Sequence, residues 1–213
     1  MPPPQWSPWA PPQHRSSLGP PPKLPSPPIP DAPSLTAPVP TIPALLAAVQ
    51  AVQQPSYDPV SKVAWSRDVI FLVNRAQQNS SADPLVGPVV ITDPQLLRLA
   101  QTAVPIILDL ASRAQQQPPI PPYIAEAVYL RATFAASGAF PDFLRQNLRA
   151  AFRDFETAAR AGYASAWFRL GRDYESFNDF PHARDCFDRG VKLGVESCCY
   201  VRSSFLQQAL IVF

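Results

Sequence analysis

The chain carries little net charge and few cysteines for its length. Its 213 residues include 18 basic and 16 acidic side chains, a formal charge of +2. That balance lacks the strong positive field of nucleic-acid-binding and anionic-membrane-binding proteins, so we expect no nucleic acid as a partner. Three cysteines, two of them adjacent at Cys198 and Cys199, do not make a disulfide framework.

Long apolar runs are missing as well. No stretch approaches the roughly 18 consecutive apolar residues that indicate a spanning helix, so we expect no direct membrane span. The first residues, MPPPQWSPW, lack the basic and apolar regions of a secretory signal. The composition, 46% hydrophobic, is still sufficient to bury a core. We therefore expect a soluble, cytoplasmic protein.

Proline is the residue in clear excess, and most of it lies near the N-terminus. Residues 1–55 hold 18 of the 29 prolines. Each proline fixes φ and lacks an amide donor, so this stretch cannot sustain a helix. We predict a disordered Pro-rich region over 1–56, in polyproline II or coil. It serves either as a linker or as a ligand for SH3 or WW modules.

Residues 42–53 break this pattern. Apolar side chains recur every three or four positions from Ile42 to Val52, and Pro43 falls in the first turn. The spacing predicts a short amphipathic helix over 42–53. This helix either caps the following domain or binds a partner.

A helical domain is predicted over 57–213. The pairs Asp58-Pro59 and Asp93-Pro94 place a side-chain acceptor before a proline, which is typical of a helix start. They open helices predicted at 59–78 and 94–116. The second helix contains Pro105, whose ring should kink it.

An internal repeat begins after these two helices. Residues 32 positions apart agree in size and aromatic character: Ala151/Ala183, Phe155/Phe187, Gly162/Gly194, Ala166/Cys198 and Phe168/Tyr200. An earlier copy matches at an offset of 39, through Ala127/Ala166 and Tyr129/Phe168, with seven extra residues in the turn SGAFPDFLRQN. Such periods are typical of stacked supersecondary units. We predict units at about 125–162 and 164–194, and a partial third unit at 196–213.

Each unit is predicted to be a helical hairpin. Apolar side chains step by three or four along the second helix of the first unit, at Leu144, Leu148, Phe152, Phe155 and Ala159. Small residues of one helix should face large ones of the next, since close antiparallel helices need both. The expected repeat-packing residues are Ala127, Tyr129, Ala151, Phe155, Gly162, Ala166, Phe168, Leu170, Gly171, Tyr174, Ala183, Phe187 and Gly194.

The pattern Ala166-x-Phe168-x-Leu170-Gly171-x-x-Tyr174, with its second helix and closing Gly194, resembles the Sel1-like repeat, a relative of the tetratricopeptide repeat (TPR). The segments SKVAWSRDVIFLVNR, EAVYLRATFAASGAFP and AWFRLGRDYESFNDFPHARDCFDRGVKLG are similar to fungal Sel1-repeat proteins of the chitin synthase activator type, over about residues 57–200. The resemblance implies an α-solenoid adaptor. Such an adaptor holds a catalytic partner and brings it to a membrane site. We expect other proteins as partners, among them a membrane-bound synthase, and recruitment of the chain to the plasma membrane by a partner.

The sequence departs from that family in two ways. The first unit has Arg131-Ala132 where Leu-Gly is expected. After Tyr200 the repeat pattern is lost, and the chain ends on LIVF without a cysteine for prenylation. A solenoid needs a polar cap on its last unit. We therefore expect a truncated or mis-spliced gene product; the alternative is an atypical apolar cap.

Motifs of catalytic sites are absent. The sequence contains no glycine-rich phosphate loop, HExxH or GxSxG. Neither His14 nor His182 has a carboxylate and a nucleophile at a spacing that indicates a catalytic triad. His182 and Cys186 lie four residues apart, which permits a metal, but Cys186 and Cys198 occupy ordinary repeat positions. We expect no catalytic residue, no cofactor and no metal.

The first helices of a solenoid line its concave side, where partners bind. In AWFRLGRDY, packing leaves four residues free, and these are our candidate protein-binding residues: Trp167, Arg169, Arg172 and Asp173. We expect a non-enzymatic adaptor, a regulator of chitin synthase or cell-wall synthesis. The alternative is a TPR-like co-chaperone that grips acidic peptide tails through Arg169 and Arg172.

Overall fold

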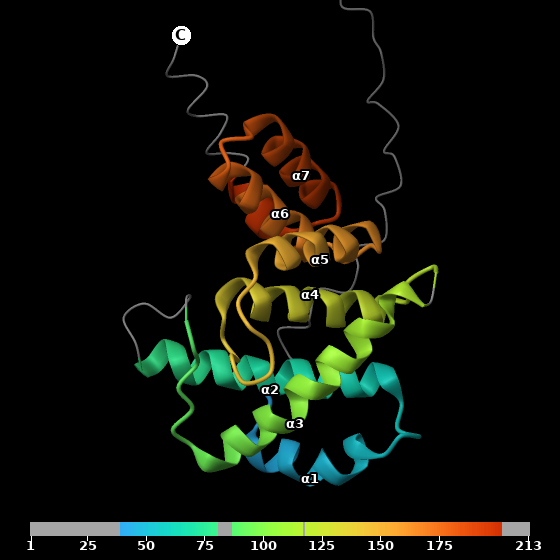
Figure 1. Cartoon of the computed structure of the whole chain (residues 1–213), viewed down its shortest axis with the longest axis vertical. Helices are drawn as coiled ribbons and strands as arrows, with labels where there is room; N and C mark the ends of the chain where they lie inside the picture. The colour runs from blue at the N-terminus through green and yellow to red at the C-terminus, as the bar shows by residue number, and fades with distance from the viewer. Residues whose placement is uncertain (1–38, 81–86, 117, 202–213) are drawn as a thin grey trace, which may run out of the picture. The chain divides into compact units, whose positions relative to one another are not determined.

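Every regular element in the described part of the chain is a helix. The computed structural model describes residues 39–80, 87–116 and 118–201. They form α1 (Ile42–Gln53), α2 (Pro59–Ser80), α3 (Pro94–Ser112), a 3-10 turn η1 (Arg113–Gln115), α4 (Pro122–Ser137), α5 (Leu148–Arg160), α6 (Ser165–Ser176) and α7 (Phe180–Lys192), with residues 196–201 helical as well (Figure 1). The predicted all-α class is confirmed. The calls on residues 1–38 and 202–213 lie outside the described residues.

Two helix ends differ from the sequence prediction. Helix α2 continues past residue 78 to Ser80. The α-helical part of α3 passes through Pro105 and ends at Ser112, before the predicted residue 116. The Arg113 amide donates to the carbonyl of Leu110, three residues back, so the chain tightens into a 3-10 turn. None of the described helices combines the length and apolarity needed to cross a membrane.

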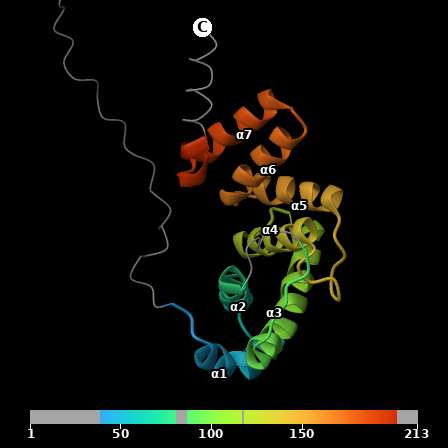
Figure 2. The ribbon, with the colours of Figure 1, turned by 90° about the vertical axis from the view of Figure 1, so that its left-hand side faces the viewer.

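The helices pack pairwise in chain order. Helices α4 and α5, α5 and α6, and α6 and α7 are neighbours, while α2 and α3 pack on each other and on α4. Figures 1 and 2 show this succession, from α1 at one end to α6 and α7 at the other. Apolar burial between successive helices is therefore what holds the fold together.

Helix α1 packs against α2 and α3. Its Val52 is 1% exposed, and the Trp65 indole of α2 donates a hydrogen bond of 3.1 Å to the Leu45 carbonyl. A buried indole N–H needs such a partner. The short helix therefore belongs to the packed body, as the capping alternative required.

The second helices of the two repeat units, α5 and α7, begin and end in the same way. The Asn147 side chain caps α5 and the Asp179 side chain caps α7, at positions 32 apart. Gly162 and Gly194 both follow their helix at positive φ, +94° and +79°. The next amide, of Tyr163 or Val195, donates over 2.9 Å to the carbonyl five residues back in each case. These matching turns give the sequence repeat a backbone counterpart.

Each hairpin also contains an equivalent aromatic pair. Tyr129 of α4 meets Phe155 of α5 at 5.6 Å between ring centroids, with an interplanar angle of 59°. Phe168 of α6 meets Phe187 of α7 at 6.2 Å and 52°. Both phenylalanines are 1% exposed. The two hairpins thus place matched residues in like environments.

The small repeat residues lie where the helices approach most closely. Those at 3% exposure or less include Ala127, Ala132, Ala151, Ala158, Ala159, Ala166, Ala183 and Cys198. Gly171 is buried against the Phe187 ring, which explains a glycine inside a helix. The structure thus places an aromatic side chain, and not a neighbouring backbone, against this glycine.

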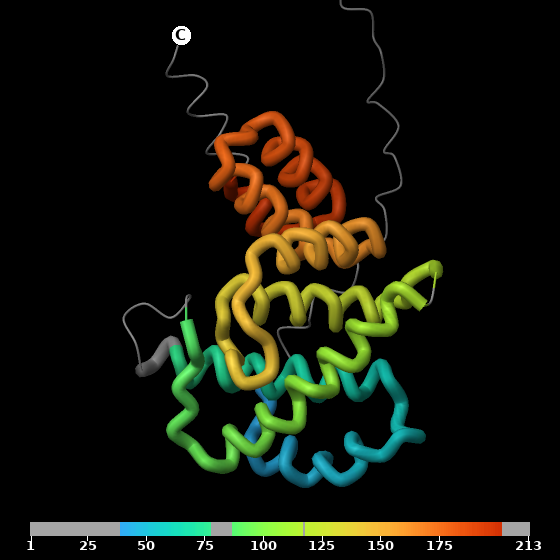
Figure 3. Tube along the Cα trace, in the orientation of Figure 1, coloured from blue at the N-terminus to red at the C-terminus, as the bar shows by residue number. Residues whose placement is uncertain are grey.

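The predicted apolar stripe on the second helix of the first unit is partly wrong. Leu144 lies before α5, and Leu148, its first residue, is 66% exposed. The connection from α4 to α5 is long and runs back towards α2 and α3 before α5 begins (Figure 3). Phe140, within it, packs edge-on against Phe134 at 4.9 Å, so α5 starts later than the spacing indicated.

The Arg131-Ala132 departure has a structural explanation. Arg131 of α4 donates two hydrogen bonds to Asp154 of α5, at 2.7 and 2.8 Å. The equivalent positions in the second unit are Leu170 and Cys186, both buried in one apolar cluster. A bidentate ion pair in one hairpin therefore takes the place of an apolar pair in the other.

We expect Gly171→Ala to lower the free energy of unfolding by about 1–3 kcal/mol, although alanine favours helices, because the added Cβ would lie 2.7 Å from Cζ of Phe187. Urea denaturation measures the change. In a Phe187→Leu background the same substitution should cost less, since the ring is gone. Equal losses of unfolding free energy in both backgrounds would contradict the contact between Gly171 and the Phe187 ring.

We expect Arg131→Leu alone to destabilise the protein by about 1–3 kcal/mol, because it leaves the half-buried Asp154 carboxylate without its partner. The double variant Arg131→Leu/Asp154→Cys, which copies Leu170 and Cys186, should recover most of that loss. Thermal unfolding of both variants checks this. Arg113→Leu, which breaks the exposed pair with Asp109, serves as control and should cost about 0.5 kcal/mol or less.

Candidate functional site

A groove of about 300 Å³ lies between α2, α4 and the chain after α4, and Arg169 reaches it from α6. Its apolar lining includes Ile70, Leu130, Phe134 and Phe140. Its polar lining includes Asn74, Gln77, Thr133 and Arg169. A concave site with an apolar floor and a few polar groups is what recognition of a peptide or small ligand requires.

Backbone hydrogen bonds build one wall of this groove. The Gly87 amide donates to the Ser137 carbonyl, and the Val89 amide to the Ala139 carbonyl, each at 2.9 Å. Gly87 takes a positive φ of +113°, which a residue with a side chain rarely adopts. The segment before α3 is thereby tied to the end of α4.

Arg169 is the charged group of the groove. Its guanidinium lies 5.5 Å from the centroid of the Phe155 ring, a cation–π contact that orients it. It forms no ion pair within 4 Å among the described residues, although Asp173 lies one turn further along α6. Burial raises the pKa of Asp173, and the positive charge of Arg169 opposes that shift. The guanidinium therefore keeps donors for a ligand.

Two tyrosines pack against each other beside Arg169, and one of them, Tyr129, lines the groove. The Tyr129 and Tyr163 rings lie 4.7 Å apart. Arg67 of α2 pairs with Glu126 of α4 at 3.0 Å, and the charges of both act on the Tyr163 hydroxyl. Burial, helped by the Glu126 carboxylate, raises the pKa of Tyr163 from 10.0 to about 12. Its hydroxyl therefore stays protonated, and able to donate a hydrogen bond, to a higher pH than that of an ordinary tyrosine.

The structure separates the four residues that the sequence offered as a binding set. Arg169 lines the groove and Asp173 lies within its electrostatic reach. Arg172 is exposed and pairs with Glu175 at 2.7 Å. Trp167 packs partly buried, with the Arg189 guanidinium 4.9 Å over its ring.

Sequence reasoning missed the contribution of the earlier helices. Asn74 and Gln77 lie one turn apart on α2, and Tyr129 and Thr133 one turn apart on α4. That spacing puts each pair on one face. Nothing in the sequence shows that the two faces meet, because their meeting depends on how α2 and α4 pack against each other.

The histidine and cysteines considered for a metal are occupied otherwise. His182 contacts the Asp179 carboxylate at 2.8 Å and stacks on Tyr174. Burial raises the pKa of the Cys186 and Cys198 thiols to about 11. Within the described ranges, no three potential ligands gather into a metal site.

Comparisons with protein families, with curated proteins and with solved structures find no match for this chain.

We expect alkaline titration to detect Tyr163 separately. Its folded pKa of about 12 exceeds the ordinary 10.0, so the stability it contributes is complete below pH 10 and is lost as pH rises towards 12. Burial also raises the pKa of Tyr129 and Tyr174. Absorbance at about 295 nm should therefore show tyrosinates that form late, and Tyr163→Phe should remove part of this late absorbance. Loss of an early step in Tyr163→Phe would contradict the assignment.

Proposed function

We propose that the protein is a non-enzymatic adaptor that binds a segment of a partner protein in the groove between α2, α4 and α6. The observation that carries this proposal is Arg169, a cation without an ion pair among the described residues, at an apolar-floored groove. Matched hairpins supply a rigid frame for such a groove.

The Sel1-like resemblance supports the same proposal at a finer level. The matched caps, the aromatic pairs and the buried small residues are what stacked hairpins of this class need. On this basis we propose an α-solenoid of Sel1-like units that regulates chitin synthase or cell-wall synthesis. Recruitment to the plasma membrane would then come from the synthase.

A second candidate is a TPR-like co-chaperone that binds acidic peptide tails. The guanidinium of Arg169 favours it, because a carboxylate is the natural partner of such a fork. The two-arginine version has less support, since Arg172 is committed to Glu175. Any acidic tail would therefore be read by Arg169 with the amide and hydroxyl groups of the groove.

Co-purification with a co-expressed fungal chitin synthase tests the adaptor. We expect Arg169→Glu to lower the bound synthase at least tenfold, because charge reversal in a binding groove costs more than about 1.4 kcal/mol. Arg172→Glu is the matched control on the same helix and should change binding less than twofold. Equal losses in both variants would contradict the groove as the site.

A competitor distinguishes the two candidates. A synthetic peptide with an acidic C-terminal tail should displace the bound partner only if the groove reads carboxylates of that kind. The same peptide with an amidated C-terminus measures how much of the effect comes from the terminal carboxylate.

A further inference from the structure

A second surface lies on α5 and at the end of α6, and it shares no residue with the groove. Leu148 and Phe177 are 66% and 69% exposed. Phe152 joins them, because it lies one turn after Leu148 on α5 and its ring centroid is 6.5 Å from that of Phe177. Large apolar side chains that gather on a surface mark an interaction site.

This apolar strip has a supported base. The Phe152 ring meets Tyr174 edge-on at 5.3 Å, and Tyr174 stacks on His182 at 5.2 Å. The side chains come from α5, α6 and α7. Three helices therefore hold the strip in place, which lowers the entropy cost of binding to it.

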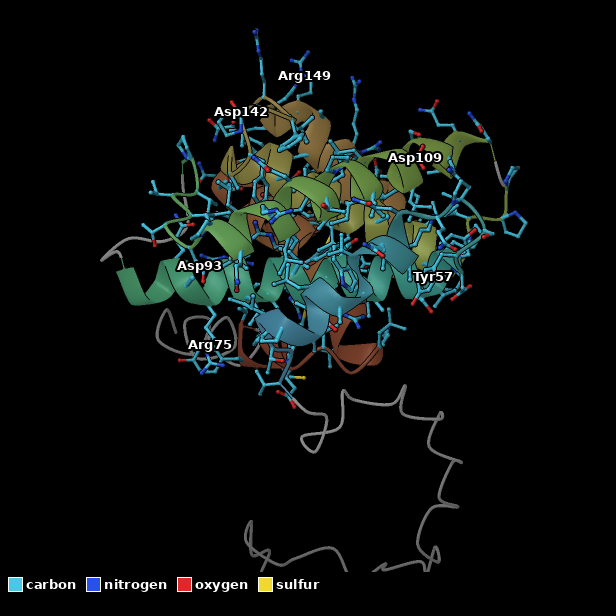
Figure 4. The ribbon with its side chains drawn as sticks, turned by 90° about the horizontal axis from the view of Figure 1, so that it is seen from below. Tyr57, Arg75, Asp93, Asp109, Asp142 and Arg149 are labelled. Carbon is cyan, nitrogen blue, oxygen red and sulfur yellow. The ribbon has the colours of Figure 1, made fainter. Side chains whose placement is uncertain are left out.

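Arginines run beside the strip. Arg149 and Arg153 lie one turn apart on α5, next to the stripe of Leu148 and Phe152, and Arg145 lies in the connection before this helix. All three are exposed, and none forms an ion pair with a described residue. Figure 4 shows Arg149 extending outward on the side of Asp142, while Arg75 lies on the opposite side of the view.

The combination defines the chemistry of the occupant. The two arginines of α5 fall short of the about four to eight basic residues that hold a protein on an anionic membrane. They suit a ligand that carries its own apolar side chains and carboxylates. A helix with apolar residues at i and i+4 and acidic residues alongside matches both stripes of α5.

We propose that this arginine–aromatic surface (Leu148, Phe152, Phe177, Arg149 and Arg153) docks an acidic amphipathic helix of a partner protein. The apolar residues of that helix pack on the strip, and its carboxylates pair with the arginines. The surface lies apart from the groove residues, so the protein could hold two partner segments at once. That is the property that a scaffold requires.

Fluorescence anisotropy with the full chain tests the proposal. The probe is a labelled synthetic helix with leucines at i and i+4 and glutamates on the flanking positions. We expect saturable binding that weakens as salt rises, and at least a tenfold loss in Arg149→Glu/Arg153→Glu. Leu148→Ser/Phe177→Ser should lose as much. Because both pairs are exposed, either variant decides the question if the other fails to fold.

Matched controls are Arg75→Glu and Val60→Ser, an exposed arginine and an exposed apolar residue on α2. Each should change binding less than twofold. The proposal is overturned if the peptide fails to bind, if the controls lose as much as the surface variants, or if the protein binds phosphatidylserine vesicles through these residues in place of the peptide. Self-association abolished by Leu148→Ser/Phe177→Ser would also overturn it, since the occupant would be a second copy.

Discussion

The hairpins depend on an aromatic ring of the second helix filling the space beside a small residue of the first. Phe187 on Gly171 is the closest case, and no Cβ fits there without displacing the ring. Phe155 lies in the same buried cluster as Ala132, the residue equivalent to Gly171. Dense packing of this kind tolerates little change in volume, so it fixes the spacing of the helices and the surfaces they present.

That spacing has consequences for both proposed binding surfaces. The same Phe155 that fills the first hairpin also lies under the Arg169 guanidinium, so one ring serves the core and positions the charge of the groove. On α5, the buried face directs Leu148, Arg149 and Arg153 outward. An adaptor needs side chains that the fold positions but that remain available to a partner, and both surfaces meet that condition.

The repeat also accommodates different chemistry at one position. Arg131 with Asp154 and Leu170 with Cys186 occupy matching places, yet one pair is ionic and the other apolar. Such exchange is possible because both partners change together, which leaves no buried charge alone. It also explains why the first unit matches the repeat pattern less well, although the turn after its second helix is the same as in the second unit.

The sequence by itself determined the helices, their caps and the repeat, because these depend on contacts within a few residues or on a period that can be counted. Asp93, directly before Pro94, caps α3 as its place in the sequence predicted. Only the tertiary structure decided the surfaces. Arg169 and Arg172 look alike in the sequence, yet one faces a groove and the other pairs with Glu175. The connection between α4 and α5 lines part of the groove and places Leu148 at the exposed start of α5. Its path is set by packing between residues far apart in the chain.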